Sequence, residues 1–274
     1  MYVCGIIDRG AADDALERTV DQFIDHLSER GRVGVLRDDA TIADGTARAH
    51  ATVAGGDVTY DLGADGDWTA TGTDLTVSDA LEALARDCEY AVVTGVDGLR
   101  YPTVAVGSDA TADDATLAAA ETPAEFDIPA VLDALEATEP YECLSSLVAR
   151  VKRSADADRA GAIGTFTGRV RAKDAPDDER TEFLEFEKYE GVADERMAAL
   201  AADLESRDGV YAVELHHRTG VVRDGEDIVF VVVLAGHRGE AFRTVEDGIN
   251  RLKDEVPLFK KEVTVDDEFW VHER

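Results

Sequence analysis

The sequence of 274 residues has few lysines, few cysteines and no long apolar segment. No apolar run approaches the roughly 20 residues that span a membrane, and the N-terminus lacks the basic and apolar regions of an export signal. The three cysteines, Cys4, Cys88 and Cys143, are far apart and near no histidine cluster, so they predict neither a disulfide framework nor a zinc site. We therefore expect a soluble cytoplasmic protein with reduced thiols.

Basic residues are also scarce, with 28 Lys and Arg against 59 Asp and Glu, for a formal net charge of −31. This balance argues against nucleic-acid binding, which requires a cationic surface. Only six of the basic residues are lysines. Dispersed carboxylates with few lysines keep a protein hydrated in concentrated salt, which indicates a halophilic source. Hydrophobic residues reach 45 %, enough for a packed core.

The two halves of the chain differ in charge. Residues 1–137 contain 28 acidic and 8 basic residues, whereas residues 138–274 contain 31 acidic and 20 basic residues, including all six lysines. Between them, residues 107–128 are small and acidic with no basic residue, which is typical of a linker. We expect a first domain at 1–110, an acidic linker with one short helix at 111–139, and a second domain at 140–274.

The first half has α/β patterning. Apolar runs predict strands at 2–7, 32–36, 90–94 and 103–106, with helices at 13–30 and 78–86 and hairpins or loops at 46–75. Gly5 and Gly10 lie where a phosphate-binding loop would, but Ala11 and Ala12 replace its Lys and Ser or Thr. This half resembles the molybdopterin-guanine dinucleotide biosynthesis B (MobB) family, which implies a degenerate, non-hydrolytic P-loop-like α/β domain.

The second half alternates helices and strands irregularly, which favours an α+β fold. Helices are predicted at 144–151, 193–207 and 239–255, and strands at 162–171, 183–189, 210–217, 227–237, 258–265 and 269–272. The strand at 227–237 is almost wholly apolar, so we expect it at the centre of a sheet.

Three groups of cations are candidates for binding an anion. Lys253 ends a helix and Pro257 turns the chain back, so Lys260 can face it. The alternative is that these lysines only complement the helix dipole and protect a strand edge. Arg171 ends a strand, and His237 and Arg238 precede a helix, where an arginine can clamp phosphate. The alternatives are that Arg171 only forms a surface ion pair and that Arg238 only caps a loop. A metal site at His216 and His217 is not expected.

These residues fall in motifs that resemble the MoaE family, the catalytic large subunit of molybdopterin synthase. The motifs are TFTGRVR (165–171), LEFEKYEGVADERM (184–197), HRTGVVRDGEDIVFV (217–231), AGHRGEAF (235–242) and LKDEVPLFKKE (252–262). The resemblance implies a MoaE-like α/β hammerhead for the second domain.

The family takes cyclic pyranopterin monophosphate and adds two sulfurs, delivered as a thiocarboxylate on the C-terminal glycine of a small ubiquitin-like carrier of the MoaD type. The absence of cysteine after Cys143 agrees with an external sulfur donor. Family positions imply Lys253 and Lys260 as catalytic residues, with no cofactor or metal. The implied substrate-binding residues are Arg169, Val170, Arg171, His237, Arg238, Lys261, Glu262 and Arg274.

The resemblance also implies a homodimer with one carrier at each end, a heterotetramer in all. Two further functions stay open at this point. The chain could be a scaffold that binds the carrier without turnover, or a target whose lysines become linked to the carrier. A phosphate clamp favours catalysis, because a docking module would not need one.

Overall fold

The computed structural model describes residues 1–12, 14–38, 58–96, 98–113, 115–173, 175–177, 179–189, 191–264 and 268–271. The chain divides into two compact units, Met1–Tyr141 and Glu142–Arg274. The boundary therefore lies two residues beyond the start that the sequence predicted for the second domain.

The first unit is built on a five-stranded parallel sheet. Its strands in spatial order are β2 (Val33–Arg37), β5 (Tyr90–Thr94), β1 (Tyr2–Asp8), β6 (Thr103–Val106) and β7 (Thr116–Ala120). Strand β1 is central, and its residues Val3–Ile6 are buried, because a parallel sheet with helices on both faces shields both sides of a strand from water.

Helices cover both faces of this sheet. Helices α1 (Ala15–Ser28) and α4 (Ile128–Glu136) pack on one face, where Phe23 and Leu132 join Ile6 in one core. Helix α3 (Val77–Ala85) packs on the other face, where Leu84 lies over Gly34 of β2. Thr76 caps α3 with a reciprocal hydrogen-bond pair to Asp79, which satisfies backbone groups at the helix start. The α/β expectation for this half is confirmed.

Residues 111–139 differ from the predicted linker. They contain β7, the single-turn helix η1 (Pro123–Glu125) and α4, and Ile128, Leu132 and Leu135 are buried in the core of the first unit. The one short helix expected in this segment corresponds to α4, but its burial in the core and the strand β7 were not predicted. Strand β7 has the sequence TLAAA, and its small side chains give a weak periodic signal.

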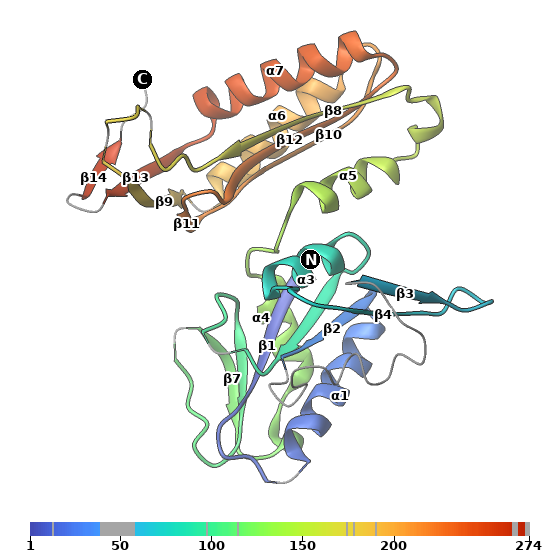
Figure 1. Ribbon diagram of the computed structural model, residues 1–274, viewed down its shortest axis with the longest axis vertical. Helices are drawn as coiled ribbons and strands as arrows, with labels where there is room; N and C mark the ends of the chain where they lie inside the picture. The colour runs from blue at the N-terminus through green and yellow to red at the C-terminus, as the bar shows by residue number, and fades with distance from the viewer. Residues whose placement is uncertain are drawn as a thin grey trace. The chain divides into compact units, whose positions relative to one another are not determined.

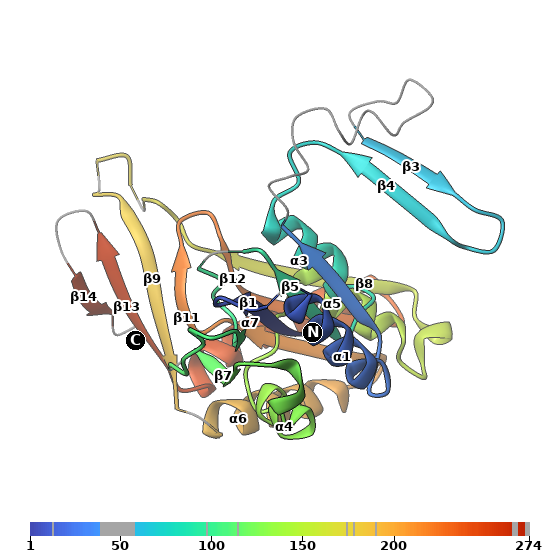
Figure 2. The same ribbon diagram turned by 90° about the horizontal axis from the view of Figure 1, so that it is seen from below.

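A separate two-stranded hairpin is formed by β3 (Val58–Leu62) and β4 (Trp68–Gly72). Figure 2 shows it extending away from the parallel sheet of its own unit. Tyr60 packs against Trp68, with ring centroids 6.3 Å apart, and both side chains are exposed. The hairpin expectation is confirmed for 58–72, and residues 46–57 lie outside the described residues.

The described residues of the second unit form two antiparallel sheets and three α-helices. The first sheet has the order β10 (Val210–His217), β12 (Asp227–Ala235), β8 (Ala162–Arg169). The second has the order β11 (Gly220–Arg223), β9 (Thr181–Lys188), β13 (Leu258–Thr264), β14 (Glu268–Val271). The α-helices are α5 (Leu144–Lys152), α6 (Val192–Glu205) and α7 (Arg238–Glu255), and η2 (Ala157–Arg159) is a single turn.

Strand β12 is buried on both faces. Val229, Val231 and Val233 face α6 and α7, while Phe230 and Val232 face α5. Figure 1 shows α7 and α5 on opposite sides of the sheet that contains β12. The predicted central position of this strand is confirmed, and so is the α+β class of the second half. In the part of the chain that the structure describes, no helix is long and apolar enough to cross a bilayer.

The loop after β6 is packed against the loop after β1, and this contact gives the first prediction. Gly107 has φ +133°, and a Cβ there would lie 2.4 Å from the Arg9 carbonyl oxygen. We expect Gly107→Ala to lower the free energy of unfolding by about 2–4 kcal/mol, because both the backbone angle and the contact become unfavourable. Urea unfolding measures the change.

The control for this variant is Gly98→Ala. Gly98 has φ +67°, and a Cβ there would have no atom within 4 Å, so only the backbone cost of about 1 kcal/mol is expected. Equal effects of the two substitutions would show that the packing of the two loops does not matter.

Candidate functional site

Lys253 and Lys260 both border a buried aromatic pair. The ring of Phe186 on β9 meets the ring of His217 on β10 edge to face, with centroids 4.8 Å apart. Lys260 pairs in register with Phe186, and paired residues on neighbouring strands point to the same face of a sheet. Lys253, exposed in the last turn of α7, lies near enough to help lower the pKa of His217. Lys253 therefore lies near His217, and Lys260 lies on the face of its sheet that carries Phe186.

His217 is held as a neutral imidazole. Its side chain is buried, and its Nδ1 lies 2.8 Å from the Arg218 carbonyl oxygen, which can only accept a hydrogen bond. Nδ1 therefore carries the proton. Burial, and to a smaller degree the charge of Lys253, lower the pKa of His217 to about 4. The sequence indicated only that His217 ends a strand, because a histidine side chain gives no signal of what it contacts.

The remaining candidates on β13 divide between the two faces of the strand. Side chains alternate along a strand, so Glu262 shares the face of Lys260 and Lys261 points to the other. Lys261 Nζ lies 3.9 Å from Glu185 on β9. Glu262 accepts a hydrogen bond from the Thr181 hydroxyl. Contacts of these two residues thus help to hold β13 against β9.

Arg169, Val170 and Arg171 lie where β8 ends. Arg169 Nε is 3.0 Å from Asp227, and its guanidinium also donates to the Gly225 carbonyl, so it fastens the turn between β11 and β12. Val170 is buried in the core, and its backbone N–H donates to the Glu226 carbonyl at 3.0 Å. Arg171 is exposed. The contacts of Arg169 and Val170 therefore hold the end of β8 against the turn between β11 and β12.

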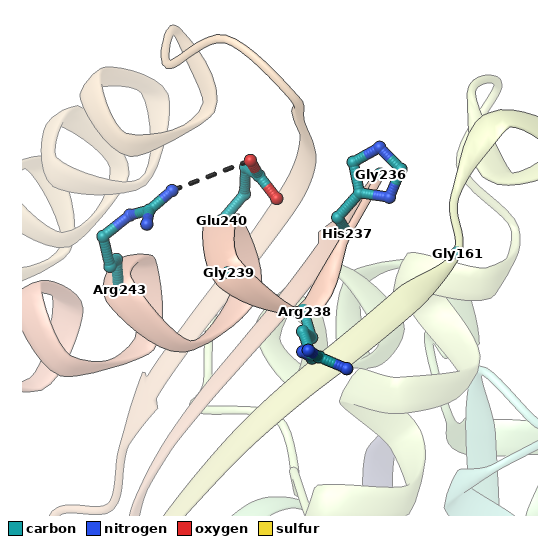
Figure 3. A pocket seen from close by; sticks show the side chains of 7 residues that line it. All are labelled: Gly161, Gly236, His237, Arg238, Gly239, Glu240 and Arg243. Atoms are coloured by element: carbon teal, nitrogen blue, oxygen red, sulfur yellow. Dashed lines mark ion pairs between the residues drawn. The ribbon is translucent and has the colours of Figure 1, made fainter.

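His237 and Arg238 form a separate group at the other end of α7. They line an open pocket of about 580 Å³, together with Glu240 and Arg243 (Figure 3). Lys253 follows Arg238 by 15 residues in the same helix, and at 1.5 Å per residue the two lie about 22 Å apart. A single chain therefore does not bring these cations to the two lysines. Arg274 lies outside the described residues.

In the first unit, a phosphate-binding loop would lie in the turn after β1. Other groups of the protein form hydrogen bonds to this turn. Asp8 Oδ1 accepts a hydrogen bond from the Ala11 backbone N–H at 2.8 Å, which is the kind of group that a phosphate would use. Asp109 N–H donates to the Arg9 carbonyl at 2.9 Å, so the loop after β6 covers the same turn. This agrees with the degenerate loop inferred from Ala11 and Ala12. Among the described residues, no group of three or more metal-ligating side chains comes together.

Comparison with known proteins now identifies the family. The family model for the MoaE protein matches residues 138–255. The chain is 47 % identical over 279 residues to a probable molybdopterin synthase of Haloferax volcanii, and the match covers all of both chains. The chain belongs to the molybdopterin synthase family. The resemblance stated from the sequence motifs is thereby confirmed.

Other proteins match about half of the chain. The molybdopterin synthase catalytic subunit of Yersinia pestis is 37 % identical over 43 % of this chain and 76 % of its own length. The crystal structure of molybdopterin synthase from Staphylococcus aureus is 28 % identical, with a TM-score of 0.43, and covers 49 % of this chain and 93 % of that one. A MobB protein homologue from Bacillus stearothermophilus is 14 % identical, with a TM-score of 0.36, and covers 50 % of this chain and all of its own.

The low pKa of His217 makes stability depend on pH. In the unfolded chain the histidine takes up a proton near pH 6.5, whereas in the folded chain it stays neutral down to about pH 4. Its contribution is therefore complete above pH 6.5 and is lost as the pH falls toward 4, by about 1.4 kcal/mol per pH unit. We expect His217→Asn, which keeps an N–H for the Arg218 carbonyl, to reduce this slope in urea unfolding between pH 7 and 5.

Exposed His26 on α1 provides the control for this measurement, as His26→Asn. It makes the same substitution at an exposed histidine of the first unit. An unchanged slope in His217→Asn would mean that His217 titrates in the folded protein as it does in the unfolded one.

Proposed function

We propose that the second unit transfers two sulfurs from a thiocarboxylated, MoaD-type ubiquitin-like carrier to cyclic pyranopterin monophosphate, giving molybdopterin. Membership of the family supports this, as do relatives named molybdopterin synthase catalytic subunit. The observation that carries the proposal is that Lys253 lies near His217, while Lys260 lies on the face of Phe186, whose ring meets His217. No observation favours the scaffold or the lysine-modified target.

The lysines have distinct roles in this proposal. Lys253 is exposed at the end of α7, so it can meet the carrier tail and move a proton at the junction of the thiocarboxylate and the pterin. Lys260 is half-buried on the His217 face of β13 and helps to neutralise the cyclic phosphate. His217 stays neutral, so it adds no positive charge beside the Lys253 amine.

A second copy of the chain is part of the proposal. Arg238 and His237 would bind the phosphate, yet they lie about 22 Å along α7 from Lys253 of the same chain. In a two-fold homodimer, the start of α7 in one protomer can approach the end of α7 in its partner. Each site would then combine Lys253 and Lys260 of one protomer with His237 and Arg238 of the other. A cytoplasmic location, which would keep the free thiols of Cys4, Cys88 and Cys143 reduced, also stays part of the proposal.

Lys253→Ala tests the catalytic role. With the full chain in high salt, thiocarboxylated carrier and cyclic pyranopterin monophosphate, we expect the rate of product formation to fall about 100-fold or more, since the proton transfer is lost. Fluorescence of the oxidised pterin product gives the rate. Lys152→Ala, at the exposed end of α5, should keep full activity. Full activity of Lys253→Ala would refute the assignment, and carrier binding without any product in the unmodified chain would favour the scaffold.

Mixed dimers test the shared site. Neither Lys253→Ala nor Arg238→Ala alone is expected to transfer sulfur well. When the two variants are co-expressed, half of the dimers are mixed and one of the two sites in each is intact, so roughly a quarter of the normal activity should return. Mixing the separately purified single-variant dimers without exchange is the control. If the co-expressed sample shows no recovery, both groups act within one protomer or the phosphate binds elsewhere.

A further inference from the structure

The hairpin of β3 and β4 has one apolar face and one polar face. Side chains alternate along a strand, and residues paired across two strands point to the same face. The register of the hairpin therefore places all of its large apolar side chains together. We call this surface the apolar hairpin face, and its residues are Val58, Tyr60, Leu62, Trp68, Ala70 and Gly72. The opposite face consists of Thr59, Asp61, Thr69 and Thr71.

The apolar hairpin face is open to solvent, although its alternating pattern is typical of strands that are buried on one side. Four large side chains on it are between 59 % and 81 % exposed: Val58, Tyr60, Leu62 and Trp68. Figure 2 shows the hairpin standing apart from the parallel sheet of its own unit. A two-stranded hairpin alone is only marginally stable in water, and an exposed apolar patch of this kind marks an interaction surface.

Charge favours a second copy of the chain as the partner. Asp and Glu account for 59 of the 274 residues, yet the one carboxylate in the two strands, Asp61, lies on the opposite face. Two copies, each with a formal net charge of −31, repel each other least where neither presents a carboxylate. A basic or acidic partner would find no group of opposite sign on this face. The face therefore fits an uncharged apolar surface such as its own.

The apolar hairpin face is also complementary to itself in shape. Trp68 pairs with Leu62 next to the turn, whereas the small residues of β4, Ala70 and Gly72, follow toward the other end. When two copies stack with their turns at opposite ends, the Trp68 ring of each fills the space over Ala70 and Gly72 of the other. Two packed sheets fill the layer between them by such interdigitation of large and small side chains. A two-fold axis relates the two copies in this arrangement.

We propose that the apolar hairpin face binds the same face of a second copy of this chain. Full burial of one aromatic side chain removes about 150–250 Å² from water, so the four large side chains of both copies together bury on the order of 1,000 Å². This area is near the lower limit for a specific interface, which gives a reversible contact rather than a permanent one. The contact lies in the first unit and is independent of the sulfur transfer and of the contact at α7 proposed above.

Photocross-linking of the purified full chain tests the contact. Tyr60 is replaced by p-benzoylphenylalanine, which on irradiation links covalently to groups that touch it. On a denaturing gel we expect a product of twice the chain mass of 29.5 kDa, and mass spectrometry should place the link in the β3–β4 hairpin of the second chain. The matched control carries the same group at Thr69 on the opposite face and should give no such product.

Val58→Asp gives a second measurement in the chain with the cross-linker at position 60. The substitution places a carboxylate on the apolar hairpin face, so the yield of the doubled product should fall about tenfold or more, because the contact would bury an uncompensated charge. Thr71→Asp places the same charge on the polar face and should leave the yield unchanged. Both side chains are exposed in the single chain, so neither substitution requires the core to change.

Three outcomes would overturn the proposal. Products of single-chain mass only, from position 60, would show that another part of the same chain covers the face. Equal yields from positions 60 and 69 would show unspecific encounters between chains. An unchanged yield in Val58→Asp would show that the contact does not use the apolar hairpin face. Sulfur transfer is measured separately, so failure of the proposed reaction would leave this result unaffected.

Discussion

The second unit depends on the burial of β12 from both sides. Phe230, Val231, Val232 and Val233 are each at most 2 % exposed, and burying one such side chain contributes about 1.5–3 kcal/mol. The strand fixes β8 and β10 by antiparallel pairing and supports α7 on one face and α5 on the other. As a result the ends of β8, β10 and α7, which carry most of the candidate residues, are attached to one rigid strand.

The length of α7 is the second constraint on function. One helix of 18 residues carries His237 and Arg238 at its start and Lys253 in its last turn. Its apolar side, with Ala241, Val245 and Ile249, is buried against the sheet, so it cannot bend to bring its two ends together. The resemblance to the family implies one substrate site for both groups, and the straight helix holds them about 22 Å apart within one chain. The homodimer proposed above would bring the start of α7 in one protomer to the end of α7 in its partner.

In the first unit, the turn after β1 takes its hydrogen bonds from the protein itself. The parallel sheet, α1 and the turn after β1 are all present. The turn is satisfied internally, because the Asp8 carboxylate takes the Ala11 N–H and residues 107–109 pack onto Arg9 and Ala11. The stability of the unit therefore does not require a bound phosphate.

Most of the secondary structure of this protein, and its family, could be determined from the sequence alone. Apolar periodicity located the helices and most strands, the run at 227–237 identified the central strand, and five motifs identified the family. These signals come from residues that are close together in the sequence, so they can be recognised without the structure. The sequence did not reveal β7, whose alanines give a weak pattern, the burial of α4 in the first core, or β11, which is short. It also could not show that His217 meets Phe186, or that Glu240 keeps an unpaired oxygen beside Gly209. Those contacts join residues that are remote in sequence, and only strand register and helix packing bring them together.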